Sequence, residues 1–155
     1  MLIVLEGCDG VGKTTLAKQL ARLLDAKIIH CSSTTPNSFN YFLSIIKAAR
    51  ETNIIADRFC YGQFVYQEEY DRPLARGCTE SSLDRLHELE IYMTMYNVKV
   101  IHVTADPEVV KERLALRKET VINNLSVDDV IAGFNAIKSL SSLEWLEYDT
   151  TGGTV

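Results

Sequence analysis

Residues 1–14 read MLIVLEGCDGVGKT, and the architecture of the chain follows from this stretch. Its first five residues are apolar without interruption, which is typical of a strand covered on both faces. Residues 7–14, GCDGVGKT, match the pattern G-x-x-x-x-G-K-[ST] at every fixed position. The leucines of residues 14–24 then recur at helical spacing. A strand, a glycine-rich loop and an amphipathic helix in this order predict a loop that binds phosphate groups.

The chemistry of a triphosphate explains why such a loop needs these residue types. Glycines let backbone N–H groups turn inward around phosphate oxygens, and the following helix adds the positive end of its dipole. Lys13 is expected to reach the β- and γ-phosphates, and the Thr14 hydroxyl to ligate Mg²⁺. We therefore expect ATP and Mg²⁺ as cofactors; a glycine-rich turn that carries Lys-Thr by chance is the alternative. The expected cofactor-binding residues are Gly7, Asp9, Gly10, Val11, Gly12, Lys13, Thr14 and Thr15.

The rest of the chain alternates strand-like and helix-like segments. Further strands are expected at residues 27–30, 53–57, 98–103 and 145–148, and helices at residues 38–51, 83–96, 106–117 and from 126 onward. Asp106 and Pro107 predict a cap and a first-turn proline for the helix at 106–117, and Ser126 predicts the cap of the last helix. Parallel strands joined by right-handed helical crossovers give an α/β domain with helices on both faces of the sheet. In such a domain the ligands bind at the carboxyl ends of the strands.

Length and composition fit a single domain over residues 1–155. Of the 155 residues, 46% are hydrophobic and 24% are charged, which excludes a disordered chain or a coiled coil. The formal net charge of −5 argues against broad contact with a nucleic-acid backbone or an anionic membrane. Glu6 and Gly7 break the apolar start, which is too short for a signal peptide or a membrane span. The four cysteines form no C-x-x-C pair, so we expect reduced thiols and a cytoplasmic protein.

Two other classes of P-loop protein find no support in the sequence. A GTPase would need an Asn-Lys-x-Asp motif to read the base, and the chain contains no Asn-Lys pair. A motor or remodelling ATPase would end a strand in Asp-Glu. Here the strand at residues 53–57 ends in Asp57, with Arg58 next to it. This pair brings a carboxylate and a guanidinium to the rim of the expected site.

On these residues the sequence resembles the thymidylate kinase-like group of P-loop nucleotide kinases. The likeness covers roughly residues 1–120 and rests on LEGCDGVGKTT (residues 5–15), Asp57-Arg58-Phe59, Tyr66-Gln67, and Asp106-Pro107-Glu108 followed by Arg113 and Arg117. It implies a three-layer P-loop kinase fold whose five-stranded parallel sheet has the order 2-3-1-4-5. It also implies ATP- and Mg²⁺-dependent phosphoryl transfer to a deoxynucleoside monophosphate, of thymidylate type, giving the diphosphate.

The expected catalytic residues combine the phosphate loop with the rim and with a lid. They are Lys13, Asp57, Arg58, Arg113 and Arg117, and the expected metal-binding residues are Thr14 and Asp57. Arg58 is suited to hold an acceptor phosphate bidentately, with a rim salt bridge as the alternative. Asp57 is expected to hold a metal-bound water or accept a proton, with a helix cap as the alternative. Arg113 and Arg117 share one helical face and predict a short lid around residues 113–125, with stabilisation of the helix dipole as the alternative.

The expected acceptor-binding residues lie on the loop and after the third strand. They are Asp9, Arg58, Phe64, Gln67, Arg72 and Arg76. The resemblance implies that the Asp9 carboxylate faces the 3′-hydroxyl of the acceptor's deoxyribose. Phe64 is expected to stack on the acceptor base and Gln67 to bind its edge, although most aromatic residues of this segment are expected in the core. Arg72 and Arg76 flank Pro73, where either is expected to approach an acceptor phosphate.

The acceptor remains open at this stage, because the sequence departs from the thymidylate kinases there. They usually carry Arg-Glu-Pro-Gly after the second strand, and this chain has CSSTTP at residues 31–36. The alternatives are a deoxynucleoside kinase, a kinase of a hydroxyl on a modified nucleotide in DNA, and a non-catalytic nucleotide-binding regulatory domain. The partner expected first is a small-molecule nucleotide, and DNA is the second. No membrane partner is expected. By analogy with the family, Ile91, Tyr92 and Met95 are candidates for a homodimer contact, with a place in the core as the alternative.

Overall fold

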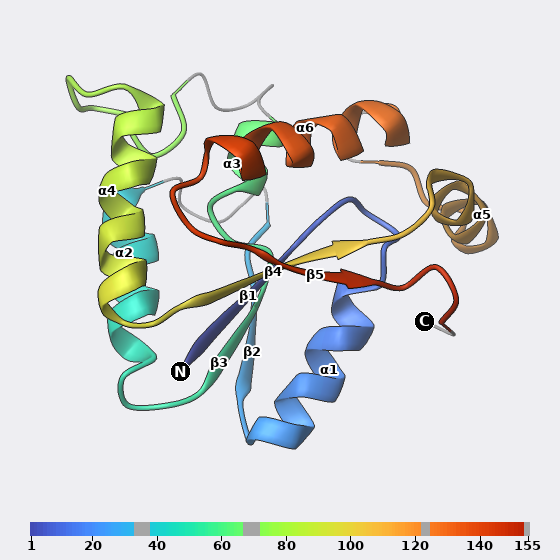
Figure 1. Ribbon diagram of the computed structural model, residues 1–155, viewed down its shortest axis with the longest axis horizontal. Helices are drawn as coiled ribbons and strands as arrows, with labels where there is room; N and C mark the ends of the chain where they lie inside the picture. The colour runs from blue at the N-terminus through green and yellow to red at the C-terminus, as the bar shows by residue number, and fades with distance from the viewer. Residues whose placement is uncertain (33–37, 67–71, 122–124, 154–155) are drawn as a thin grey trace.

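The computed structural model describes residues 1–32, 38–66, 72–121 and 125–153. Its strands and helices alternate along the chain, as expected (Figure 1). In chain order they are β1 (Leu2–Glu6), α1 (Lys13–Leu24), β2 (Lys27–His30), α2 (Phe39–Ala48), β3 (Ile54–Asp57), α3 (Gly62–Val65), α4 (Ser82–Met95), β4 (Lys99–Thr104), α5 (Pro107–Arg117), α6 (Val127–Leu140) and β5 (Leu146–Asp149). The single turn α3 is the element that the sequence patterns did not predict.

The five strands form one all-parallel sheet with the order β2-β3-β1-β4-β5. This confirms both the α/β class and the strand order that the resemblance implied. Strand β1 is the centre of the sheet and every one of its residues is buried, as its uninterrupted apolar run predicted. Helix α1 covers one face, and α2 and α4 pack together on the other (Figure 1). The site residues therefore gather where β1 and its neighbours end.

The helices begin at side chains that satisfy free backbone N–H groups. Ser38, Ser81 and Ser126 each accept a hydrogen bond from the N–H three residues later, and Asp106 accepts one from the N–H of Glu108. The expected cap and first-turn proline of α5 are thus confirmed. Strand β5 begins at Leu146 rather than at Trp145. The Trp145 indole is buried, and its Nε1 donates to Ser141 Oγ at 3.1 Å.

Glu90 of α4 is a carboxylate that is fully buried in the core. Its two oxygens accept hydrogen bonds from the Tyr61 hydroxyl at 2.7 Å, from both the backbone N–H and the hydroxyl of Ser142 at 2.9 Å, and from the Ser141 hydroxyl. These contacts tie α4 to the segment between α6 and β5. They also place Tyr61 in the core, as expected for most aromatic residues of its segment.

All four cysteines are free thiols, and Cys78 is the only one that is not fully buried. Burial raises the pKa of Cys8 to about 11 and that of Cys31 to about 12, and it raises the pKa of Cys60 well above its usual value. These three thiols are therefore protonated at neutral pH. In the described ranges of the chain, no helix has the length and apolar character that crossing a membrane requires.

Candidate active site

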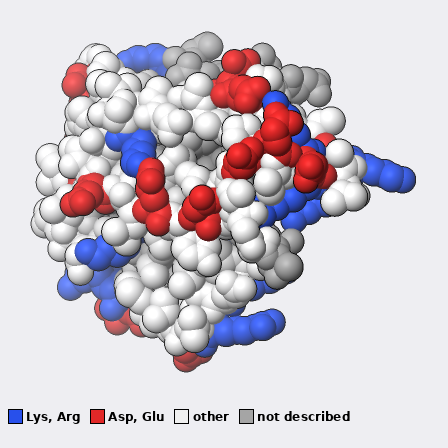
Figure 2. Space-filling model, turned by 45° about the vertical axis from the view of Figure 1, so that its right-hand side comes forward, with Lys and Arg blue, Asp and Glu red and all other residues white. Residues whose placement is uncertain are grey.

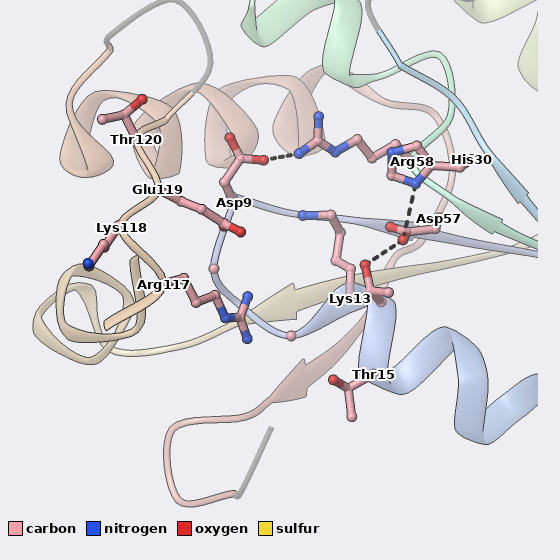
Figure 3. Close-up of a pocket in the computed structure, with 13 residues that line it drawn as sticks. Asp9, Lys13, Thr15, His30, Asp57, Arg58, Arg117, Lys118, Glu119 and Thr120 are labelled. Atoms are coloured by element: carbon pink, nitrogen blue, oxygen red, sulfur yellow. Dashed lines mark hydrogen bonds and ion pairs between the residues drawn. The ribbon is translucent and has the colours of Figure 1, made fainter. Parts of the chain in front are cut away.

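A pocket of about 790 Å³ opens at the carboxyl ends of β1, β2 and β3 (Figure 3). The residues that line it come from the glycine-rich loop, the strand ends and the segment after α5. They are Asp9, Gly10, Gly12, Lys13, Thr14, Thr15, His30, Asp57, Arg58, Arg117, Lys118, Glu119 and Thr120. Small-molecule pockets measure about 300–1,000 Å³, so this one has room for a nucleotide.

The glycine-rich loop has a backbone shape that other residues would not adopt easily. Gly7 has φ 151°, and a Cβ there would collide with the backbone oxygen of Val103 on β4. Gly12 has φ 97° and stands directly before the first turn of α1. These two glycines let the loop pass close over β4 and then turn into the helix, which leaves its N–H groups facing the pocket.

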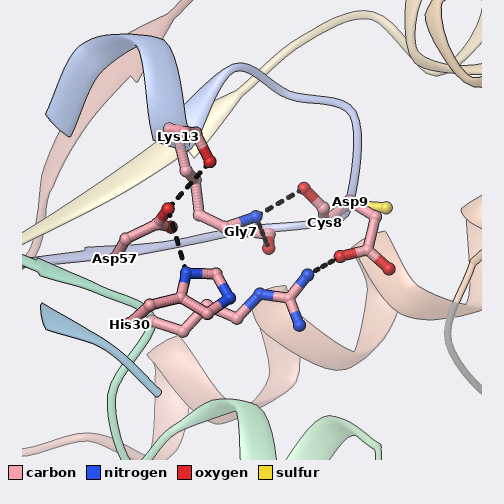
Figure 4. A network of polar contacts seen from close by, with 8 residues as sticks. Gly7, Cys8, Asp9, Lys13, His30 and Asp57 are labelled. Carbon is pink, nitrogen blue, oxygen red and sulfur yellow. Dashed lines mark hydrogen bonds and ion pairs between the residues drawn. The ribbon is translucent and has the colours of Figure 1, made fainter. Parts of the chain in front are cut away.

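Lys13 folds back across the mouth of the loop. Its Nζ donates hydrogen bonds to the carbonyl oxygens of Gly7 at 2.7 Å and Cys8 at 2.8 Å (Figure 4). The side chain is buried, and this burial lowers the pKa of the ammonium, while the negative charges of Asp57 and Glu6 oppose the shift. The ammonium group that we expected to bind the phosphates is therefore positioned at the loop by hydrogen bonds to the loop's own backbone.

Asp57 joins Thr14 and His30 at the end of β3. Its Oδ2 accepts a hydrogen bond from Thr14 Oγ1 at 2.8 Å and lies 3.3 Å from His30 Nδ1, while its buried Oδ1 has no hydrogen-bond partner. Mg²⁺ prefers oxygen ligands and usually combines one or two carboxylates with substrate phosphates and water. A free carboxylate oxygen next to a hydroxyl fits that ion. Among the described residues, no group of three or more His, Cys, Asp or Glu side chains is placed so that it could hold a metal ion.

Arg58 reaches across the pocket from the residue after β3. Its guanidinium forms an ion pair with Asp9 Oδ1, and its Cζ lies 5.8 Å from the centre of the Tyr66 ring (Figures 3 and 4). The backbone at Arg58 is left-handed, with φ 71°, and its N–H donates to Leu5 O at 3.0 Å. The structure thus brings two of the expected acceptor residues together, on the loop and on the facing wall.

The lid segment contributes Arg117 but not Arg113 to the pocket. Helix α5 ends at Arg117, and Lys118 takes a left-handed conformation with φ 55° that turns the chain along the pocket. The guanidinium of Arg113 instead donates to Thr150 Oγ1 at 2.9 Å and to Thr150 O at 2.7 Å. Thr150 Oγ1 in turn donates to Val11 O at 2.6 Å. Arg113 therefore supports the glycine-rich loop from behind.

Replacing Arg113 with alanine is expected to lower the free energy of unfolding by about 1–3 kcal/mol, because it removes charge-assisted hydrogen bonds to a buried threonine. Lys111→Ala is the matched control on the same helix. Lys111 is exposed and pairs with Glu108 and Asp128, so its loss is expected to change stability by less than about 1 kcal/mol. Urea unfolding measures both. Equal effects of the two substitutions would refute the supporting role of Arg113.

Three other expected acceptor residues, Phe64, Arg72 and Arg76, do not line the pocket. Phe64 is half-buried and packs against the core. Arg72 is exposed, and its guanidinium donates to the backbone oxygens of Cys78 and Glu80. Arg76 is exposed on the same turn. Gln67 lies outside the described residues, as do residues 122–124 of the expected lid.

His30 entered the site only with the structure, and Glu6 lies buried directly before the glycine-rich loop. His30 stands on β2, which pairs with β3 so that His30 lies beside Asp57. Glu6 ends β1 and is fully buried; its Oε1 accepts a hydrogen bond from the N–H of Phe59 at 2.9 Å, while Oε2 has no partner. Burial raises the pKa of Glu6 from 4.5 to about 7, against the hydrogen bond from Phe59 and the charges of Lys13 and Arg58. The position of Glu6 before the loop was the sequence signal for it.

This pKa predicts a pH dependence of stability. The folded state binds the Glu6 proton more tightly than the unfolded state, so its contribution is complete below about pH 4.5 and is lost as the pH rises to about 7. At about 1.4 kcal/mol per pH unit the loss amounts to about 3 kcal/mol. Glu6→Gln is expected to remove it, so the variant gains stability relative to the parent between pH 4.5 and 7. Urea unfolding across this range tests this, with exposed Glu51→Gln as control; parallel curves for Glu6→Gln and the parent would contradict it.

Comparison with known proteins gives two matches that cover most of the sequence. A family model described as "AAA domain" matches residues 3–129. The SPbeta prophage-derived uncharacterized protein YorR of Bacillus subtilis (strain 168) is 33% identical over 153 residues, which make up 96% of this chain and 88% of YorR.

Solved structures with the same fold include kinases of nucleosides and nucleotides. The crystal structure of Bacillus subtilis YorR in complex with phosphorylated GDP has a TM-score of 0.77 at 28% identity, covering 97% of this chain and 86% of that one. Deoxyadenosine kinase from M. mycoides with bound dATP has a TM-score of 0.59 at 16% identity, covering 100% and 93%. Thymidylate kinase from Candida albicans has a TM-score of 0.56 at 19% identity, covering 99% and 84%. At these identities the last two show a common fold. With its glycine-rich loop and its sheet order the chain has the P-loop kinase fold, and its matches to the family model and to YorR show that it belongs to the family described as "AAA domain".

Proposed function

We infer that the protein is an ATP- and Mg²⁺-dependent kinase that phosphorylates a deoxynucleoside monophosphate, of thymidylate type, to the diphosphate. The observation that carries this proposal is the placement of two opposite sets of groups in one pocket. The phosphate-binding loop with Lys13 forms one wall, and Asp57 and Arg58 form the other. The YorR crystal structure, with phosphorylated GDP, adds support because that relative binds a purine nucleotide.

On the donor side the chain supplies positive charge and positions the triphosphate. Phosphoryl transfer depends mainly on such positioning and charge. Lys13 leaves the carbonyl oxygens of Gly7 and Cys8 for the phosphates, and Arg117 approaches from the lid segment. Thr14 and Asp57 would hold Mg²⁺, which neutralises charge on the phosphates when bound. Closure of the lid residues over the pocket excludes water.

On the acceptor side Arg58 exchanges one anion for another. In the absence of an acceptor its guanidinium pairs with Asp9. An acceptor phosphate replaces that carboxylate and gains two parallel hydrogen bonds from the guanidinium. The Asp9 carboxylate then accepts a hydrogen bond from a sugar hydroxyl. On the same wall, the unpartnered Oδ1 of Asp57 would hold a metal-bound water or accept a proton from the attacking group.

A nucleoside is the second candidate acceptor. Of the three arginines expected on the acceptor side, only Arg58 lines the pocket, and Asp9 already neutralises it. A neutral acceptor would need no further cation there. Transfer to a DNA hydroxyl would need a basic channel for the nucleic-acid backbone. It has weaker support, because Arg58 and Arg117 line the pocket but Arg72, Arg76 and Arg113 do not.

An ADP-release assay with each deoxynucleoside monophosphate, each deoxynucleoside and a short oligonucleotide tests the proposal, with mass spectrometry of the product. A diphosphate product supports the first candidate, and a monophosphate formed from a nucleoside supports the second. ATP binding without any phosphorylated product would refute both and leave a nucleotide-binding regulatory domain. EDTA is expected to abolish turnover in either enzymatic case.

By analogy with the family, we also propose that the protein forms a homodimer. Ile91 and Met95 of α4 are 60% and 67% exposed. Tyr92 is half-buried, and its ring lies 6.2 Å from that of Phe39 on α2, so it serves the packing of the two helices. Sedimentation of the protein and of Met95→Glu tests the dimer: a single monomeric species in both samples would refute it.

A further inference from the structure

A second cavity lies behind the glycine-rich loop, between the loop, β4 and α6. Its volume is about 220 Å³, and it is lined by Cys8, Val11, His102, Val103, Thr104, Ala105, Ile131, Phe134 and Asn135. Neighbouring residues of the loop face opposite sides: Cys8 and Val11 line this cavity, while Asp9, Gly10 and Gly12 line the large pocket. The loop is therefore a wall that two cavities share.

The buried imidazole of His102 lacks a hydrogen-bond partner in this cavity wall. The residue is 4% exposed and its Nδ1 makes no hydrogen bond. The nearest carboxylate oxygen, Glu147 Oε1, lies 3.9 Å away and already accepts a hydrogen bond from Lys138. Burial lowers the pKa of His102, so the ring is neutral and offers one donor and one acceptor nitrogen. A buried polar atom without a partner is costly unless a ligand or water satisfies it.

The rest of the lining defines the chemistry of an occupant. The described residues of this wall include no Asp, Glu, Lys or Arg, so a charged ligand would find no counter-ion. Phe134 and Ile131 of α6 and Val103 of β4 supply apolar surface, and the Cys8 thiol stays protonated. An apolar cavity of about 150 Å³ is large enough for benzene. At about 220 Å³, this cavity accommodates one or two fused rings.

We propose that this cavity binds a neutral, planar nitrogen heterocycle of one or two rings, which hydrogen-bonds His102 and contacts the rear of the glycine-rich loop. Such a ligand touches the donor site without entering it. Val11, which lines the cavity, also accepts the hydrogen bond from Thr150 that Arg113 supports. Ligand binding is therefore coupled to the loop conformation that receives the triphosphate, and the coupling is reciprocal.

Benzimidazole is the probe for this site, and indane, of the same shape without nitrogen, is its control. In NMR titrations of the full chain, benzimidazole is expected to bind with a dissociation constant near or below roughly 1 mM. It is expected to shift the amide signals of Cys8, Val11 and Ile131. Shifts confined to Lys13, Thr14 and Arg117 would place benzimidazole in the large pocket and overturn the proposal, as would the absence of binding.

The substitution His102→Phe tests whether benzimidazole binding depends on the hydrogen bond to His102 or only on the shape of the cavity. The variant keeps a ring of similar shape, so benzimidazole is expected to bind about two- to tenfold more weakly, while indane changes little. Equal changes for both probes would overturn the role of His102. Ala105→Leu fills the cavity from another side and is expected to weaken the binding of both probes. This variant keeps the proposal testable if His102→Phe does not fold. Unchanged binding of both probes to Ala105→Leu would place their site elsewhere.

Discussion

Replacing Lys13 with alanine is expected to lower kcat for phosphoryl transfer by at least about 10³-fold. The ammonium is the cation closest to the centre of the loop, where it already bonds two carbonyl oxygens of that loop at 2.7 and 2.8 Å. The loop's N–H groups cannot replace it, because they carry only partial charge. Burial also keeps water from taking its place at the phosphates.

Lys18→Ala is the matched control for this substitution. Lys18 lies on the same helix α1 and is exposed, so its loss is expected to leave kcat within about twofold of the parent. Circular dichroism and urea unfolding verify that both variants fold. If Lys13→Ala folds and retains more than about a tenth of the parental kcat, the loop does not act on the transferred phosphate and the proposed function fails.

Arg58→Ala is expected to lower kcat/KM for the acceptor by about 10²–10³-fold, while the KM for ATP changes by less than about threefold. The guanidinium projects from the wall that faces the loop, and it is the group that would hold the acceptor phosphate. Alanine keeps the Cβ and the left-handed backbone of Arg58, so the substitution tests the guanidinium and not the chain conformation. Initial-rate kinetics with each substrate varied in turn separate the two effects.

Two further variants give the Arg58 experiment its controls. Arg72→Ala removes an exposed arginine that bonds backbone oxygens outside the pocket, and its kinetics are expected to match the parent. Arg58→Lys keeps the charge but not the bidentate geometry, so it is expected to recover only part of the activity. An ATP KM that rises as much as the acceptor KM in Arg58→Ala would assign the guanidinium to the donor side.

The fold and the donor half of the site could be predicted because their signals are local. Residues 1–24 contain a strand, a loop and a helix in direct succession, and each is visible as a short pattern. The caps at Ser126 and Asp106 are equally local, and the structure has both. The sheet order could not come from such patterns. It came from the family resemblance, and the model confirms it.

The contacts within the site could not be predicted because they join distant parts of the chain. Asp9 and Arg58 are 49 residues apart, and their ion pair depends on the loop and β3 ending at the same edge of the sheet. His30 reaches Asp57 only through the register of β2 and β3. Helical spacing put Arg113 and Arg117 on one face correctly. It could not show that Thr150, which follows the last strand, lies against the first of them.

Because three of the four thiols are buried, the protein can be labelled for spectroscopy at a single natural cysteine. Cys8, Cys31 and Cys60 are shielded and protonated, so a maleimide dye is directed to Cys78 without any engineered cysteine. Cys78 sits on the turn that Arg72 holds, between α3 and α4. A fluorophore attached there would report on the surroundings of this turn in protein of natural sequence, one molecule at a time.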